Sequence, residues 1–600
     1  MNNYLKVNLD AFIFFFKMSP KYWIVFIVNQ VINVFYSYTD LFLFAKLINQ
    51  FVAPINLSAI IKIIVYLIIF RFSLNIIKNV MDYFTAVYYK EFINNENLFF
   101  LKKFLNVEYS DMEKTHFRQL RRTIAESENA GYGKIAYIDT VKGLFYNIFS
   151  VIVSTYLFVG LFISLIKNGI DFGYICLFLL LFVFIISKIT LNNYVSKKIN
   201  GAFASKVNEF VRINRVDDSI DSYSQGKDIR LYRQNEYILN VNKEIFSSWK
   251  KIWEYIFNSK HRYYIPSAIL SRLEYFYTSF FLIHLVFIGK MLPGSYFSNL
   301  GYMENFSKSL YTIFANISFL KNNTEHIERY ISFCDFKEKS RDGFTFDNVH
   351  FNKVSFNNVS FKYPGCEETV LKNISINIKK GKKYAVVGQN GSGKSTFIKL
   401  LCRLYEPEEG CIQIDNYKAC EINIDDYWKM FSVIFQDFNL FSFTLGQNIS
   451  VCDSPSEEQL LSIIEKVGFF DRYKDMEQGL DTLLYKNFDE KGVEISGGEA
   501  QKIALARAIY KDGEIFILDE PTAALDPIAE SELYDNFNKI VQDKTVIYIS
   551  HRLASCKFCD EIIVFDKGQI VQSGTYESLL KDKKGKYYEL WTAQAKHYNT

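Results

Sequence analysis

The stretch GQNGSGKST, from Gly388 to Thr396, has the spacing of a phosphate-binding loop. It matches G-x-x-x-x-G-K-[ST] and stands between a strand-like run, KKYAVV, and a helix-like run, KSTFIKLLCRL. Glycines here let backbone N–H groups close around phosphates, and the N-terminus of the following helix adds positive potential. Lys394 should reach the β and γ phosphates, and Ser395 should offer its hydroxyl to Mg²⁺. The residues expected to bind ATP in this loop are Gly388, Asn390, Gly391, Ser392, Gly393, Lys394, Ser395 and Thr396.

Polar residues at the ends of other strand-like runs are expected to supply the rest of the chemistry. The run IFILD ends at Asp519 and is followed by Glu520, and the runs VIFQD and VIYISH place Gln436 and His551 at strand ends. In such sheets the strand ends of one edge point toward the ligand. We expect Asp519 to hold the Mg²⁺ shell and Glu520 to polarise the attacking water, with His551 as the second catalytic residue. For Gln436 and His551, a plain surface position is the alternative interpretation.

A second phosphate-binding pattern follows about a hundred residues after the loop. The residues SGGE, Ser496 to Glu499, open the helix-like run AQKIALARAIY. A serine and two glycines at a helix N-terminus suit a phosphate group. One chain therefore carries two such sites, and the sequence raises the question of whose phosphate the second one holds.

Six apolar stretches in the first half of the chain are long enough to span a bilayer. The connection 90–142 carries nine Lys and Arg and the connection 194–262 carries thirteen, whereas the opposite connections hold only Lys167 and Lys290. By the positive-inside rule, both long connections and both termini face the cytosol. The amphipathic run from Tyr4 to Lys17 is expected to lie in the membrane interface. The six stretches are roughly 22–48, 58–82, 143–166, 172–192, 264–289 and 295–319.

From about Val354 onward, strand-like runs alternate with helix-like runs, which predicts an α/β domain with a largely parallel sheet. The fold class is therefore an α-helical six-span transmembrane domain plus an α/β P-loop NTPase domain. We expect a transmembrane domain over 1–320 with long cytosolic helical extensions, a linker over 321–350 and the nucleotide-binding domain over 351–600.

Charge and cysteine content exclude some function classes. The net charge of +4 gives no case for a nucleic-acid partner. Eight of the nine cysteines lie at or after Cys334, in the part expected to be cytosolic, so free thiols are the default expectation. Cys556-x-x-Cys559 has no second CxxC or His pair at zinc spacing, and we interpret it as coincidence.

Taken in order, the Lys394 loop, Gln436, ISGGE, LDE, Asp526 and His551 resemble the nucleotide-binding domain of the ATP-binding cassette (ABC) family. With the apolar stretches ahead of it, the chain is similar to an ABC exporter half-transporter. The resemblance implies head-to-tail pairing of two cassettes, with Ser496, Gly497, Gly498 and Glu499 contacting the nucleotide held by the partner's loop.

The resemblance also implies roles for single residues. Tyr363 would stack on adenine, Gln436 would bind Mg²⁺ and link it to the membrane domain, and Asp526 would couple the two sites. The family's usual signature is LSGGQ, and this chain has Ile495 and Glu499 instead. A carboxylate in the first turn of a helix is tolerated by the helix dipole, so we expect a working site.

The resemblance implies an ATP-hydrolysing efflux pump with ATP and Mg²⁺ as cofactors, and the expected location is the bacterial plasma membrane. A homodimer is the default expectation, and a heterodimer with a second half-transporter is the alternative. The expected cargo is a peptide, for example bacteriocin-like or modified; a multidrug or lipid exporter is one alternative and an ATP-gated channel or regulatory membrane protein is another. No peptidase-like segment precedes the first stretch, so leader cleavage is not expected.

Two further groups of residues could serve transport. Turns that couple cassette and membrane helices are expected near Glu113–Arg122 and near Tyr223–Leu231. Charge at membrane depth is costly and usually faces a cavity. The ionisable residues within the apolar stretches are Asp40, Arg71, Arg272, Glu274, His284 and Glu304.

Overall fold

The computed structural model describes residues 3–52, 57–129, 131–167, 180, 182–195, 223–339, 341–345, 351–451, 455–486, 489–520, 541, 543–550 and 553–598, and the statements below concern these residues. The chain divides into two units. The first contains Met1–Asn106 and Thr115–Phe336, and the second contains Val107–Lys114 and Lys337–Thr600.

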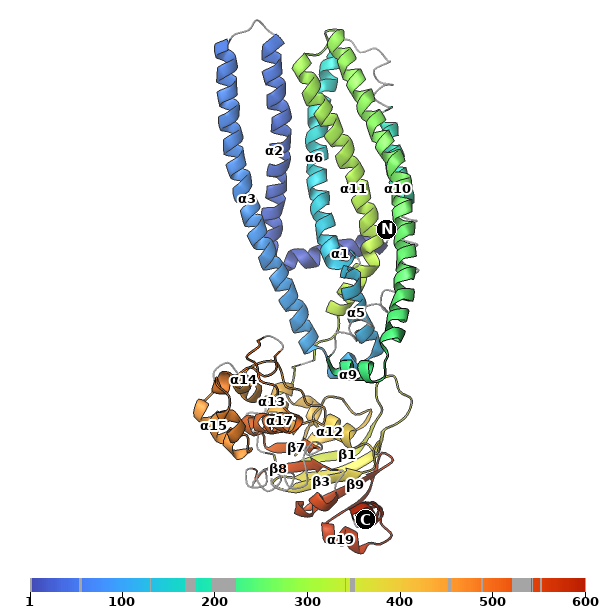
Figure 1. The fold of residues 1–600 in the computed structure, drawn as a ribbon, viewed down its shortest axis with the longest axis vertical. Coiled ribbons are helices and arrows are strands. Elements are labelled where there is room, and N and C mark those ends of the chain that lie inside the picture. The colour runs from blue at the N-terminus through green and yellow to red at the C-terminus, as the bar shows by residue number, and fades with distance from the viewer. Residues whose placement is uncertain are drawn as a thin grey trace. The chain divides into compact units, whose positions relative to one another are not determined.

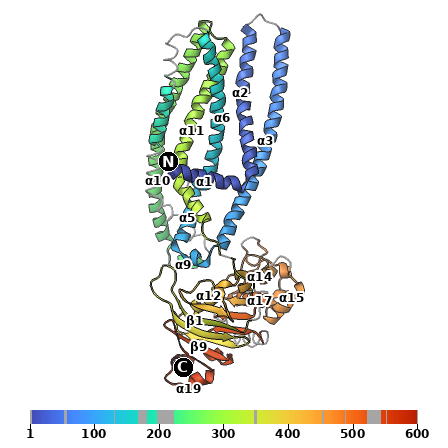
Figure 2. The same ribbon diagram turned by 180° about the vertical axis from the view of Figure 1, so that it is seen from behind.

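Long helices build the first unit, and several of them run side by side in Figures 1 and 2. Three are long and apolar enough to cross a membrane, over Pro20–Phe51, Ile60–Asn106 and Gly133–Leu157. The helices are α1 (Asn3–Met18), α2 (Pro20–Val52), α3 (Leu57–Asn106), α5 (Thr115–Asn129), α6 (Gly133–Lys167), α9 (Tyr223–Leu231), α10 (Asn235–Phe287) and α11 (Pro293–Cys334).

The remaining predicted stretches fall on other elements. Part of 172–192 lies outside the described residues, and Phe182–Val195 is a shorter apolar helix. The stretches 264–289 and 295–319 lie inside α10 and α11. The predicted linker 321–350 begins within α11, which continues as one helix to Cys334, so its first part is helix rather than connection.

Aromatic side chains fasten α1 to the longer helices. In both ribbon views α1 lies across them. The ring of Phe15 lies 5.9 Å from that of Tyr330 on α11 and 6.2 Å from that of Phe92 on α3. Trp23 on α2 donates from Nε1 to the carbonyl oxygen of Phe15 at 3.1 Å. Phe15 and Trp23 are buried, whereas Leu5, Leu9 and Ile13 are exposed, as expected for an amphipathic helix.

Two sheets form the second unit. One is antiparallel, in the order β2-β1-β4-β5, and the other is β10-β9-β3-β8-β7-β6, with β10 antiparallel and the other pairs parallel. The strands are β1 (Lys353–Phe361), β2 (Leu371–Lys379), β3 (Lys383–Gly388), β4 (Glu409–Ile414), β5 (Tyr417–Lys418), β6 (Phe431–Ile434), β7 (Ile515–Asp519), β8 (Thr545–Ile549), β9 (Glu561–Asp566) and β10 (Gln569–Gly574).

The parallel sheet is buried on both faces, because alternate residues of each strand enter different cores. On β7, Ile515 and Ile517 pack with the antiparallel sheet and α12, while Phe516 and Leu518 pack on the opposite side with α14, α15 and α17. The helices of this unit are α4 (Tyr109–Glu113), α12 (Lys394–Leu401), α13 (Ile424–Lys429), α14 (Leu445–Ser450), α15 (Glu457–Lys466), α16 (Phe470–Lys474), α17 (Gly497–Lys511), α19 (Tyr576–Lys581) and α20 (Lys586–Tyr598).

The prediction of a largely parallel sheet is confirmed for the central sheet. The runs that became β1 and β2 belong to the separate antiparallel sheet, in which β1 pairs with both β2 and β4. Both runs are strand-like by pattern, and the pattern carries no information on pairing partner or direction.

Candidate functional site

The loop between β3 and α12 has the backbone of a phosphate cradle. Gly393 precedes α12 with a φ of +105°, and a Cβ added there would lie 2.5 Å from Cδ2 of Leu371. Gly391 also has positive φ, at +77°. A side chain at Gly393 would strain the backbone and collide, so glycine keeps the loop close to the N-terminus of α12.

The side chain of Lys394 is folded onto this loop. Its Nζ donates to the carbonyl oxygens of Gly388 at 3.0 Å and Gln389 at 3.1 Å. Burial lowers the pKa of Lys394, while the nearby carboxylates of Glu520 and Asp519 act in the opposite direction. A half-desolvated ammonium facing the loop is suited to a phosphate, which would supply stronger charge-assisted contacts than carbonyl oxygens.

Asp519 and Ser392 each carry a buried oxygen atom at the phosphate loop. Among the described residues, Oδ1 of Asp519 and Oγ of Ser392 have no hydrogen-bond partner. Burial, with the adjacent charge of Glu520, raises the pKa of Asp519 to about 6, and the Ser395 hydroxyl and Lys394 oppose this shift. An unsatisfied carboxylate oxygen near a serine hydroxyl fits Mg²⁺, which prefers oxygen ligands and keeps places for phosphate oxygens. Ser395 and Asp519 would hold the ion, with Gln436 at the same edge.

Gln436 and Glu520 are brought together at the carboxyl ends of β6 and β7. Nε2 of Gln436 donates to Oε2 of Glu520 at 3.0 Å. Glu520 has a φ of +50°, which is unusual for a residue with a side chain, and its N–H is held by the carbonyl of Ile549 at 3.1 Å. The contact keeps the Glu520 carboxylate at the sheet edge where Lys394 and Asp519 also lie.

Tyr363 lies beside the loop helix. Its hydroxyl and the hydroxyl of Thr396 are 2.9 Å apart, and its ring packs edge-on against Tyr405 with 5.4 Å between ring centroids. The structure thus places the expected adenine-stacking residue next to the loop. Its stacking on adenine stays a prediction.

The SGGE segment caps α17. Oγ of Ser496 accepts from the N–H of Glu499 at 3.3 Å, and Oε2 of Glu499 accepts from the N–H of Ser496 at 2.8 Å and from its hydroxyl at 2.9 Å. Arg472 of α16 adds an ion pair, with Nε 3.0 Å from Oε1 of Glu499. Burial alone would raise the pKa of Glu499, but the hydrogen bonds from Ser496 and the charges of Arg472 and Lys502 lower it. Arg472 is a residue that the sequence reasoning missed.

A short helix from the membrane half of the sequence belongs to the cassette unit. In α4, Glu113 accepts from the hydroxyl of Tyr405 and its Oε1 lies 3.8 Å from Nζ of Lys399, while the ring of Tyr109 lies 5.6 Å from that of Tyr405. Most of the range predicted as a coupling turn, Glu113–Arg122, is helix, because α5 begins at Thr115, and its coupling role stays a prediction. The other predicted turn, Tyr223–Leu231, is the helix α9, and its coupling role stays a prediction.

Some predicted site residues lie outside the described residues, namely His551 and Asp526. Cys556 and Cys559 are both buried, and burial raises the pKa of the Cys556 thiol to about 12, which leaves it poorly reactive. Within the described part of the chain, no group of three or more His, Cys, Asp or Glu is arranged to hold a metal ion.

Three of the six ionisable residues predicted within the apolar stretches form ion pairs. Asp40 of α2 pairs with Arg71 of α3, with 2.7 Å between Oδ2 and NH2, and Glu274 of α10 pairs with Lys188. For Arg272, His284 and Glu304, a place beside a cavity stays a prediction.

The fold and the site define a membrane protein with a P-loop nucleotide-binding domain. Residues 371–523 match the family described as ABC transporter. The fold resembles the solved structure of a bacterial Atm1-family ABC exporter with ATP bound, with a TM-score of 0.74 and 19% identity over 96% of this chain and 98% of that one. The chain therefore contains an ABC transporter domain and has the fold of an ABC exporter.

Two curated relatives match beyond the cassette. The chain is 36% identical over 367 residues to the subtilin transport ATP-binding protein SpaT of Bacillus subtilis, covering 59% of this chain and 58% of that protein. It is 33% identical over 318 residues to the nisin transport ATP-binding protein NisT of Lactococcus lactis subsp. lactis, covering 52% of each. The matched part thus spans only a little over half the length of these relatives.

Proposed function

We propose that the chain is an ATP-driven exporter that hydrolyses ATP to move a peptide out of the cytosol. One arrangement carries this proposal: Lys394, the unsatisfied oxygen of Asp519 and the Gln436–Glu520 contact meet at the end of the phosphate loop. These are the groups that phosphoryl transfer to water requires. A protein that only bound nucleotide to gate a pore would not need the carboxylate of Glu520 at this place.

The residues divide the hydrolysis of ATP between them. Backbone N–H groups of the loop and Lys394 hold the β and γ phosphates, and Ser395, Asp519 and Gln436 would hold Mg²⁺, which neutralises phosphate charge when bound. Glu520 accepts a hydrogen bond from the attacking water and takes its proton as the new P–O bond forms and the bond to ADP breaks. His551, which follows the β8 segment in the sequence, would donate to the γ-phosphate.

The second phosphate site is proposed to act on another copy of the chain. Ser496, Gly497 and Gly498 at the N-terminus of α17 would close on the γ-phosphate held by the partner's loop, so that two chains enclose two nucleotides. Loss of the γ-phosphate contact after hydrolysis would let the pair open. We propose a homodimer, with Asp526 coupling the two sites and Tyr363 stacking on adenine.

The proposed peptide cargo rests on how far the relatives match. The 367-residue match to SpaT and the 318-residue match to NisT are longer than the stretch from Lys337 to Thr600, so they extend into the membrane half. Relatives named for lipid A-core or iron-sulfur cluster transport match over 38–43% of the chain, which the cassette alone can supply. The membrane half is where cargo would be recognised, so the longer matches favour a bacteriocin-like peptide over a lipid.

We place the protein in the bacterial plasma membrane with the cassette and both termini in the cytosol. The nine and thirteen basic residues of the two long connections support this orientation. The two relatives with the longer matches come from bacteria.

Glu520→Gln tests the proposed function. It keeps the side chain's shape and the contact with Gln436 but removes the proton acceptor, so ATP should still bind while hydrolysis falls by about 10²–10⁴-fold. Steady hydrolysis of Mg–ATP by the chain purified into lipid vesicles measures this, with binding of labelled ATP measured in parallel.

Glu577→Gln, an exposed carboxylate of α19, serves as the matched control and should leave turnover unchanged. If Glu520→Gln hydrolyses ATP near the wild-type rate, Glu520 is not the general base. If the wild-type chain hydrolyses no ATP in any lipid or with any added peptide, the exporter proposal fails.

A further inference from the structure

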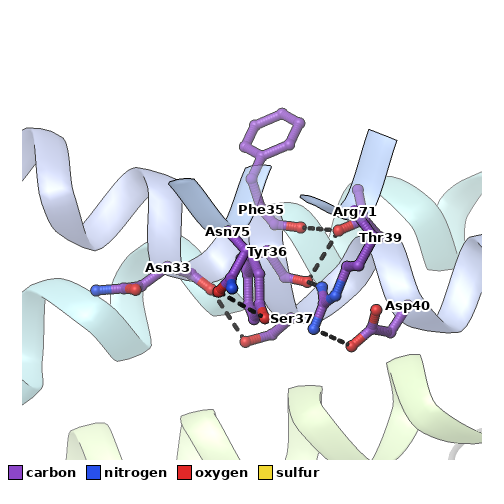
Figure 3. Close-up of polar contacts among 8 residues, drawn as sticks. All are labelled: Asn33, Phe35, Tyr36, Ser37, Thr39, Asp40, Arg71 and Asn75. Atoms are coloured by element: carbon purple, nitrogen blue, oxygen red, sulfur yellow. Dashed lines mark hydrogen bonds and ion pairs between the residues drawn. The ribbon is translucent and has the colours of Figure 1, made fainter. Parts of the chain in front are cut away.

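A row of polar side chains lies where α2 and α3 face each other, and Figure 3 shows part of it. We name it the α2–α3 seam. The spacings of three and four residues place its members on one face of each helix. Its contacts run in antiparallel order, from Asn29 with Asp82, through Tyr36 with Asn75, to Asp40 with Arg71. The seam consists of Asn29, Asn33, Tyr36, Asp40, Arg71, Asn75, Lys78 and Asp82.

The two cations of the seam already have partners. Arg71 donates to Oδ2 of Asp40 at 2.7 Å and to the carbonyl oxygen of Tyr36 at 3.0 Å, and its guanidinium carbon lies 3.5 Å from the centroid of the Tyr36 ring. Lys78 donates to Asp82 at 3.1 Å and lies 5.4 Å from the same ring. Figure 3 shows Arg71 stacked over Tyr36 and turned toward Asp40. These contacts use two of the N–H donors of Arg71 and one of those of Lys78, so each cation is already engaged by a carboxylate of the seam.

Two hydrogen-bond acceptors of the seam have no donor among the described residues. Oδ1 of Asn29 and Oδ1 of Asn33 are buried and have no hydrogen-bond partner among the described residues. The orientation of the Asn29 amide is fixed by chemistry, because its Nδ2 donates at 2.9 Å to the carboxylate of Asp82, which can only accept. Buried acceptors without donors are costly, and they favour the entry of a group that carries N–H donors.

Asp40 differs from Glu274, another carboxylate of the predicted apolar stretches, in being open. Its side chain is 51% exposed while Arg71 is 30% exposed, whereas Lys188 and Glu274 are about one-tenth exposed on both sides. Glu274 is therefore shielded from a ligand, whereas the carboxylate of Asp40 can be reached. An open carboxylate at membrane depth is expensive unless it faces water or a ligand cation.

We propose that the α2–α3 seam binds a basic peptide segment of the cargo, with Asp40 as the counter-ion of an ammonium or guanidinium group. The amide oxygens of Asn29 and Asn33 would accept N–H groups along the same segment. Asn29 and Asp40 are eleven positions apart on one helix, about 16 Å, which an extended peptide of about five residues covers. The inference rests on the proposed export of a peptide and adds that the cargo is cationic.

In this proposal Arg71 and the cargo compete for the carboxylate of Asp40. Both cations seek the same carboxylate, so removing the Arg71 charge should strengthen cargo binding, and removing the Asp40 charge should weaken it. A pair that served only to hold α2 against α3 would respond to either change in the same direction, with loss of stability. Opposite directions therefore separate ligand binding from structural support.

The test uses the full chain in nanodiscs of neutral phosphatidylcholine, with two short fluorescent peptides of leucine and lysine or of leucine and glutamine as probes. Peptide binding and the peptide concentration that half-stimulates ATP hydrolysis are measured, each relative to the same variant without peptide. Asp40→Asn should weaken binding of the lysine probe at least tenfold, Asp40→Glu should restore it, and Arg71→Gln should strengthen it several-fold. The glutamine probe should bind weakly and equally to all variants.

Glu274→Gln is the matched control, since it removes another intramembrane carboxylate that is buried and paired, and it should not change the preference for lysine. The inference is overturned if Asp40→Asn and wild type bind the lysine probe alike, if the wild type binds both probes alike, or if Arg71→Gln weakens binding as Asp40→Asn does. These results would leave ATP hydrolysis by the wild type intact. Failure of the proposed function is distinct, because it would appear as a wild-type chain that hydrolyses no ATP.

Discussion

Arg472 places a positive charge beside the SGGE segment, and this contact leads to a prediction at the scale of single residues. The carboxylate of Glu499 lies in the first turn of α17, where a phosphate is proposed to bind, and would repel it if left unpaired. Arg472→Ala should therefore raise the KM for ATP about twofold to fivefold with little change in kcat. Steady-state ATP hydrolysis by the reconstituted chain measures both constants.

The double variant decides whether charge is the cause. Glu499→Gln keeps the hydrogen bond to the Ser496 N–H without the negative charge, so Arg472→Ala combined with Glu499→Gln should return KM to the wild-type value. The pKa of Glu499 lies below its ordinary 4.5, so the carboxylate stays ionised above that pH and the Arg472→Ala defect should be equal at pH 6 and pH 8. A defect that persists in the double variant would show that Arg472 acts through packing instead.

The residue scale also shows what local sequence can predict. Lys394, Ser395 and the loop glycines are contiguous, so their shared role is visible in the motif, and Asp519 with Glu520 stands out as a strand end. The pairing of Arg472 with Glu499 joins residues on different helices, and only the packing of α16 near α17 brings them together. No pattern in the sequence marks such a pair.

At the scale of elements, α4 packs within the second unit through contacts of Glu113 and Tyr109 with Tyr405. Tyr405→Phe removes the hydroxyl that Glu113 accepts from, while the ring packing with Tyr109 and Tyr363 remains. We expect peptide transport per ATP to fall several-fold, with basal hydrolysis changed by less than about twofold, because the phosphate loop is untouched. Transport and hydrolysis in the same proteoliposomes give this ratio.

Asp111→Asn is the control for α4, because Asp111 pairs with Lys114, three positions along the chain. It should leave the ratio of transport to hydrolysis unchanged. An unchanged ratio in Tyr405→Phe would mean that the Glu113 contact carries no coupling.

The position of α4 shows why element boundaries were harder to predict than elements. The charged run after Glu113 suggested an exposed turn, yet Phe117, Leu120 and Ile124 recur at helical spacing and are buried, so this run is the amphipathic helix α5. The segment that packs against Tyr405 is α4, the aromatic and acidic helix before α5. The helices and strands themselves were predictable, because their hydrophobic periods are local. The unit to which a segment belongs depends on contacts between residues distant in the sequence, and a local pattern does not reveal these contacts.

At the scale of the whole molecule, the two phosphate sites of one chain predict a division of labour between copies. Lys394→Ala disables the loop, and Ser496→Arg blocks the capping segment, so each variant alone should hydrolyse little ATP. In a mixed dimer, the loop of the Ser496→Arg chain meets the intact SGGE segment of the Lys394→Ala chain. Co-assembly of the two variants should therefore restore a fraction of the wild-type rate.

The control is a mixture, in the same ratio, of wild type with the chain that carries both substitutions. In this mixture only wild-type pairs contain a complete site. Recovery in the first mixture would support a shared site. Its absence, with mixed dimers verified by differential tagging, would contradict the head-to-tail arrangement.

Helix α3 is unbroken, so a tilt at one of its ends moves residues far along its axis. It runs from Leu57 to Asn106, and Arg71 stands thirty-five positions from the end at Asn106, about 52 Å along the axis. A tilt of about 5° about that end would carry Arg71 sideways by about 4–5 Å, more than the reach of a hydrogen bond. If α2 does not move with α3, such a tilt would separate Arg71 from Asp40. The affinity for a cationic cargo would then depend on the tilt angle of α3, which is set far from the proposed cargo site.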